Sequence, residues 1–179
     1  MSSSAAFDDF ADDFLAERTP RMMIIVGASK IDALLCDTLA AYLVPKRAKS
    51  NDQDELLEGD RPLGAFSSRI KMCYRLAIVD ESLYLILETI RSIRNASAHA
   101  ISFDASVSPT REHISELRKC VEPRSSYKWT KERYFANQSL TKTEELQCLL
   151  LTICVLLEGV RKKTTQTKGN KTTMAISKR

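Results

Sequence analysis

The sequence predicts a single all-α domain of about six helices arranged as a helical bundle. Along most of the 179 residues, apolar side chains recur at the three- and four-residue spacing that marks one face of a helix. Only 5 glycines and 5 prolines are present, which is fewer than a turn-rich β-sandwich requires. A chain of this length can bury about 70% of its unfolded surface in one core, so folding requires neither disulfides nor a metal.

Two helices are predicted in the first quarter of the chain. Residues 1–18 form an acidic amphipathic helix with Phe7, Phe10, Ala11, Phe14 and Leu15 on its apolar face. The pair Thr19-Pro20 predicts the start of the second helix, because a capping hydroxyl precedes proline at the first helical position. This second helix runs to Pro45 and is apolar on several sides, which indicates deep burial.

The main domain is predicted to cover residues 19–163 and to contain four more helices after an exposed connection at 45–61. The third helix begins at Phe66, and the fourth begins after an N-cap at Asp80 and runs to about Ala98. A shorter helix follows Ser108-Pro109, and the last helix follows a capping box at 141–144. Because the last helix is apolar on two sides, we expect it to be central or to lie at a subunit interface. Residues 164–179 are expected to form a disordered basic tail.

The net charge of +4 is concentrated at the two ends of the chain. Residues 161–179 carry seven basic residues and no acidic one, whereas residues 1–17 carry five acidic residues and no basic one. The segment between them is nearly neutral. The total charge is therefore no indication that the whole protein binds nucleic acid.

Composition also bears on metals, cofactors and location. The five cysteines form no Cys-x-x-Cys pair and the chain has two histidines, so we expect no metal and no cofactor. Reduced, structural thiols favour a cytoplasmic location. The N-terminus lacks the basic and apolar regions of a signal peptide, and the longest apolar run, residues 149–157, covers less than half of the ~20 residues of a membrane span.

Arg94, Asn95 and His99 are the candidate catalytic residues. Arg94 falls within the predicted apolar stripe of the fourth helix and therefore requires a partner, while Asn95 and His99 share a face one turn apart. An arginine can hold a phosphate and a histidine can transfer a proton, so the set suits metal-independent RNA cleavage across a dimer that pairs two His99 side chains. In the structural alternative, Arg94 bonds a buried carboxylate, Asn95 a loop backbone, and His99 favours the helix C-terminus.

Two further groups are candidate contacts for nucleic acid or a partner. Arg69 could bind a carboxylate such as Asp32 or Glu88, which is a packing role, and Arg91 lies on the fourth helix. Residues 124–135, interpreted as a loop, mix basic and aromatic side chains that could stack on bases or close the edge of the core. The candidates in this segment are Lys128, Trp129, Lys131 and Arg133.

The sequence resembles two known families. Arg94-Asn95 followed by His99 is similar to the Arg-x4-His signature of the HEPN superfamily, which implies a ribonuclease or nucleotide-binding domain. A broader pattern lies within residues 22–120: in order, VGA with ID and L at 26–35, PLGAFSSRI at 62–70, IRSIRNASAH at 90–99 and SFD at 102–104. These segments together resemble the mannitol operon repressor family of small all-α bacterial regulators.

Together these observations favour a bacterial transcriptional regulator of the mannitol-repressor kind. The resemblance implies regulation through protein partners, and no helix-turn-helix signature is present that would indicate a dedicated DNA-binding motif. We also expect a homodimer. Contact with nucleic acid has less support in the sequence than contact with a protein, and no membrane contact is expected. The alternative is the HEPN-type ribonuclease that uses Arg94 and His99.

Overall fold

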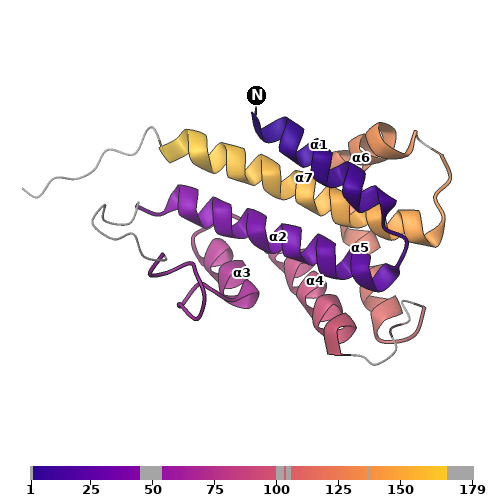
Figure 1. The fold of residues 1–179 in the computed structure, drawn as a ribbon, viewed down its shortest axis with the longest axis horizontal. Helices are drawn as coiled ribbons and strands as arrows, with labels where there is room; N and C mark the ends of the chain where they lie inside the picture. The colour runs from indigo at the N-terminus through magenta and orange to yellow at the C-terminus, as the bar shows by residue number, and fades with distance from the viewer. Residues whose placement is uncertain (1, 45–53, 100–102, 104–105, 137, 169–179) are drawn as a thin grey trace, which may run out of the picture.

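The structure is a computed structural model that describes residues 2–44, 54–99, 103, 106–136 and 138–168. These residues form seven α-helices and no strand, which confirms the all-α prediction (Figure 1). The additional helix is α6, in the segment that we interpreted as a loop. The helices are α1 Ser2–Ala16, α2 Pro20–Tyr42, α3 Phe66–Arg75, α4 Glu81–His99, α5 Thr110–Val121, α6 Ser125–Phe135 and α7 Lys142–Lys168.

The two longest helices, α2 and α7, form the centre of the bundle. They lie side by side and run in the same direction (Figure 1). Gly27 of α2 faces Leu150 of α7, and a Cβ at residue 27 would lie 3.1 Å from Cδ1 of that leucine. The glycine therefore allows the two helices to approach closely. The apolar residues on several sides of α7 are buried, as the central position predicted for this helix requires.

The other helices cover this central pair. Helices α3 and α4 pack against α2, and α5 packs against both α4 and α7. Helix α6 packs against α7, and α1 lies across α2 and α7 (Figure 1). One continuous hydrophobic core results, to which each of the seven helices contributes buried side chains.

Helix α1 is held to the bundle by its apolar face and by one buried glutamine. Ala11 and Phe14 are buried, as the amphipathic pattern predicts. Gln147 of α7 donates hydrogen bonds from Nε2 to the carbonyl oxygens of Phe14, Leu15 and Glu17, at 3.1, 3.2 and 2.9 Å. The last four carbonyls of a helix have no intrahelical partner, and this one side chain binds two of those in α1 as well as the carbonyl of Glu17 just beyond the helix.

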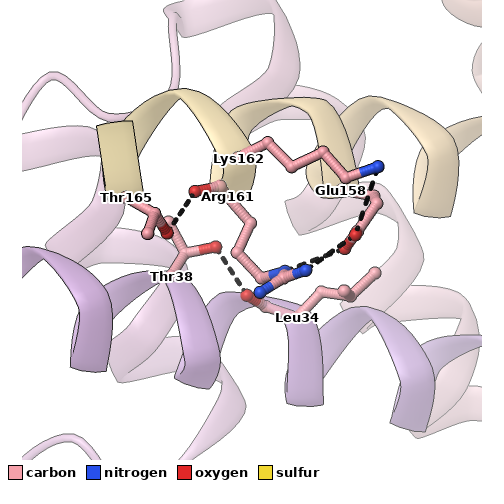
Figure 2. A network of polar contacts seen from close by, with 6 residues as sticks. All are labelled: Leu34, Thr38, Glu158, Arg161, Lys162 and Thr165. Atoms are coloured by element: carbon pink, nitrogen blue, oxygen red, sulfur yellow. Dashed lines mark hydrogen bonds and ion pairs between the residues drawn. The ribbon is translucent and has the colours of Figure 1, made fainter. Parts of the chain in front are cut away.

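Polar side chains gather where the C-terminal half of α7 packs against α2, with their hydrogen bonds made within each helix (Figure 2). Glu158, which is only 9% exposed, accepts hydrogen bonds from Arg161 at 2.8 and 2.7 Å, and Lys162 lies 3.7 Å away. On α2, the buried hydroxyl of Thr38 donates to the carbonyl of Leu34 at 2.6 Å. The charged groups thus enter the helix interface as a paired set, which is the condition for burying a carboxylate at low cost.

The predicted starts of α2, α4 and α7 are correct. Leu83 N donates to Asp80 Oδ1 at 2.8 Å, which confirms the N-cap of α4, and Thr141 and Glu144 form the predicted capping box. Hydrogen bonds from Thr141 hold the pKa of Glu144 below its ordinary value. Helix α2 begins at Pro20 with Thr19 at the N-cap position, as predicted, although the Thr19 side chain makes no cap hydrogen bond.

Helix α7 continues to Lys168, so the first five residues of the segment expected to be disordered, 164–168, are helical. The hydroxyls of Thr164 and Thr165 donate to the carbonyls four residues earlier, at 3.0 Å each, so they are satisfied within the helix. The rest of that segment, 169–179, lies outside the described residues. The helix therefore ends beyond the predicted domain boundary at residue 163.

All five cysteines are free thiols. Cys73, Cys148 and Cys154 are buried, and burial raises the pKa of Cys73 and Cys154 to about 12 and that of Cys148 to about 11. These three are therefore protonated, inert members of the core at neutral pH. Among the described helices, none is both long and apolar enough to cross a membrane.

Candidate functional site

The C-terminal end of α4 carries the candidate catalytic residues, but Arg94 does not lie in the apolar stripe predicted for it. Its side chain is exposed, and its Nη1 donates a 3.4 Å hydrogen bond to Asn95 Oδ1. The expected position in the apolar stripe is wrong because the last turns of α4 bury Ile93 and Ser97 instead. No carboxylate of the described residues pairs with Arg94, so it does not require the buried partner that we expected.

His99 is exposed in the last turn of α4. One residue earlier, the carbonyl of Ala98 accepts a 3.5 Å hydrogen bond from Arg21 Nη2 of α2. Basic side chains at this position interact favourably with the negative, C-terminal end of the helix dipole of α4, as the structural alternative for His99 proposes. The pairing of two His99 side chains across a dimer stays a prediction.

Arg69 and Arg91 both take part in intramolecular ion pairs. Arg69 Nη1 lies 2.7 Å from Asp32 Oδ1, and its Nη2 donates to the Leu57 carbonyl at 2.8 Å. This confirms that Arg69 has the packing role, with Asp32 as its carboxylate partner. Because the Arg69 side chain is only 11% exposed, little of its surface can contact another molecule. Arg91 donates to Glu88 of its own helix at 3.2 and 2.8 Å, which raises the pKa of Arg91.

Helix α6 corrects the loop interpretation of residues 124–135. Tyr127, Thr130 and Phe135 turn inward and are buried, so the core-closing alternative is right for these side chains. Trp129, in contrast, is 47% exposed. Lys128 and Arg133 are exposed with it, and Lys131 is half-buried.

Trp129 and its neighbours form an ordered cluster on the outer face of α6. The rings of Trp129 and Tyr134 meet edge to face with centroids 6.1 Å apart. The guanidinium carbon of Arg133 lies 5.7 Å from the first ring centroid and 5.5 Å from the second. Arg133 is therefore held by cation–π contacts in a fixed orientation.

Helix α1 completes this cluster. Asp8 Oδ1 accepts hydrogen bonds from Arg133 Nη2 and from the Tyr134 hydroxyl, both at 3.0 Å. Burial raises the pKa of Tyr134, which keeps the phenol protonated as a donor. Asp8 could not be identified as a site residue from the sequence, because no spacing rule joins Asp8 to Arg133, 125 residues away. The only available signal was the opposite charge of the two segments.

A cavity of about 370 Å³ lies between α1, α6 and α7 beside this cluster. Gly159 is exposed on its α7 side, and a Cβ there would meet no atom within 4 Å, which indicates open space above the helix. We call this region the Trp129 surface. It comprises Phe7, Asp8, Trp129, Arg133, Tyr134, Gly159 and Lys162.

No protein-family model and no curated protein sequence matches the chain. Two solved structures share its fold. The MtlR–HPr complex from Escherichia coli matches with a TM-score of 0.60 and 18% identity, covering 88% of this chain and 99% of that one. A possible transcriptional regulator, YggD, from Shigella flexneri 2a matches with a TM-score of 0.61 and 15% identity, covering 89% and 96%. These likenesses extend over nearly all of both chains and show that the protein has a mannitol-repressor-like fold.

Proposed function

We propose that this protein is a bacterial transcriptional regulator that binds a partner protein through the Trp129 surface. The observation that carries the proposal is the half-exposed Trp129 beside a preorganised arginine. Tryptophan, tyrosine and arginine are enriched among the few residues that carry most of the binding energy of protein interfaces, and these residues lie in well-packed pockets once the partner is bound. The fold supports the same proposal, since one structural neighbour was solved in complex with HPr.

The charges on this surface favour a protein partner over a nucleic acid. Arg133 pairs with Asp8, and Lys162 lies 3.7 Å from Glu158. Beside the surface, Lys128 lies 3.9 Å from Glu132 of α6. Binding to a phosphate backbone requires unpaired cations that can displace condensed counterions. Paired cations around an exposed aromatic ring are instead suited to a protein surface of mixed polarity.

Binding to HPr is the direct test. Titration of this protein with HPr of the same organism in a calorimeter should give a saturable heat, and Trp129→Ala should weaken the affinity at least ~30-fold, or about 2 kcal/mol. The matched control is Tyr74→Ala on α3, which also removes an exposed aromatic ring and should leave the affinity within about twofold.

Two results would contradict the proposal. One is a parent protein that gives no heat with HPr at 100 μM concentrations, which lie well above the Kd of specific complexes. The other is a Trp129→Ala variant that folds normally and binds HPr as tightly as the parent does.

A further inference from the structure

A second and larger cavity, of about 760 Å³, lies at the end of the bundle where α2 and α7 begin. Because these helices run in the same direction, their N-termini lie at the same end, with α5 beside them (Figure 1). Sites for small organic ligands commonly have volumes of about 300 to 1,000 Å³. The cavity shares no lining residue with the Trp129 surface.

One wall of this cavity is apolar. Pro20 comes from the start of α2, Ile114 from α5 and Leu146 from the first turns of α7, and Phe103 adds an aromatic ring. Ile114 and Phe103 are only partly buried although both pack against the core, so apolar surface remains accessible in the cavity. Such a wall suits the aromatic or branched body of a small molecule.

The other wall is basic. Arg111 and Arg118 lie on either side of Ile114, and this three- and four-residue spacing places all of them on one face of α5. Lys142 approaches from the start of α7. Glu145 is the acidic residue of the lining, so the lining carries three positive charges and one negative charge.

The three basic side chains differ in how closely each is already paired with a carboxylate of the protein. Arg118 pairs with Glu145, although its buried Nε has no hydrogen-bond partner among the described residues. The guanidinium of Arg111 lies 3.6 Å from the carboxylate of Glu112, which is a loose and exposed contact. Lys142 has no ion pair within the described part of the chain. The positive N-terminal ends of the α2 and α7 dipoles add to the positive electrostatic potential around it. Arg111 and Lys142 are therefore the groups that a ligand's charge would meet.

We propose that this cavity binds a small organic anion with an apolar body. Its carboxylate or phosphate lies between Arg111 and Lys142, and its body lies against Ile114 and Phe103. Charge-assisted bonds to two cations fix the anionic group, and burial of the apolar body supplies the remaining affinity. This site is independent of the partner surface at Trp129 and gives the regulator a place to sense a metabolite.

The test uses 8-anilinonaphthalene-1-sulfonate, a fluorescent anion with an apolar body, on the full chain. We expect saturable binding of one dye per protein, displaced by 2-naphthoate but not by uncharged 2-naphthylmethanol. Arg111→Gln and Lys142→Gln should each weaken dye binding about tenfold, the cost of one charge-assisted contact. Displacement by 2-naphthoate compared with naphthyl phosphate then shows which anionic group the site prefers.

Lys119→Gln is the matched control, because it removes the same charge from an exposed position on α5 that does not line the cavity. It should bind dye as the parent does, and so should Trp129→Ala. Circular dichroism and thermal unfolding identify any variant whose fold has changed. The proposal is wrong if the folded parent binds no dye, if Lys119→Gln weakens binding as much as Arg111→Gln, or if Trp129→Ala abolishes it.

Discussion

Replacing Gln147 with leucine is expected to lower the free energy of unfolding by about 3 kcal/mol and to release the end of α1. The side chain is 1% exposed and donates to the carbonyls of Phe14, Leu15 and Glu17. Leucine has a similar volume but no donor, so these carbonyls lose their common partner. Leaving buried polar groups unsatisfied costs about 1–3 kcal/mol each. The Phe14 carbonyl keeps its 3.3 Å hydrogen bond from Glu17 N, and water that reaches the more exposed end of α1 recovers a further part of the loss.

Urea denaturation measures the stability change, and hydrogen exchange measures the loosening of α1. Gln166→Leu is the matched control, because it makes the same substitution at an exposed position of the same helix and should cost less than about 0.5 kcal/mol. Equal stability of Gln147→Leu and the parent would show that α1 is held by its apolar face alone. Because Asp8 belongs to α1, the Gln147→Leu variant should also bind the partner more weakly.

The second large effect is expected for Glu158→Ala, at about 2 kcal/mol. Glu158 accepts hydrogen bonds from Arg161 and lies near Lys162, and its removal leaves Arg161, whose side chain is 26% exposed, without this carboxylate (Figure 2). Removing one partner of a fully buried ion pair costs about 3–5 kcal/mol, and the partial exposure of Arg161 reduces that figure.

The matched control for this substitution is Glu132→Ala, which breaks an exposed pair with Lys128 on α6. Exposed pairs contribute about 0–1 kcal/mol, so this variant should unfold at nearly the same urea concentration as the parent. If Glu158→Ala is no less stable than Glu132→Ala, the ion pairs of Glu158 with Arg161 and Lys162 contribute no more to stability than exposed pairs do.

The helices that could be predicted are those in which periodicity and end signals agree. In α4 the cap at Asp80 and the apolar stripe both appear in the sequence, and both are present in the structure. In α6 only Tyr127, Thr130 and Phe135 are buried, and the large apolar ring of Trp129 turns outward. A stripe this sparse, interrupted by an exposed aromatic residue, does not distinguish a helix from a loop.

The candidate site was less predictable than the fold because it depends on tertiary contacts. An ideal angular projection placed Arg94 in the buried stripe, but the side that α4 buries changes along its length toward Ser97. Asp32 could be named as a partner of Arg69 because both lie in predicted helices. Asp8 could not be named as a partner of Arg133, since the choice among the acidic residues of α1 depends on how that helix crosses α7.

The central claim is that the partner protein docks on the Trp129 surface, and hydrogen–deuterium exchange of the HPr complex tests it most directly. On addition of saturating HPr, amide exchange should slow in α6 and α1 and stay unchanged at the C-terminal end of α4. Slower exchange around Arg94 and His99, with α6 and α1 unchanged, would contradict the claim and place the partner at the end of α4.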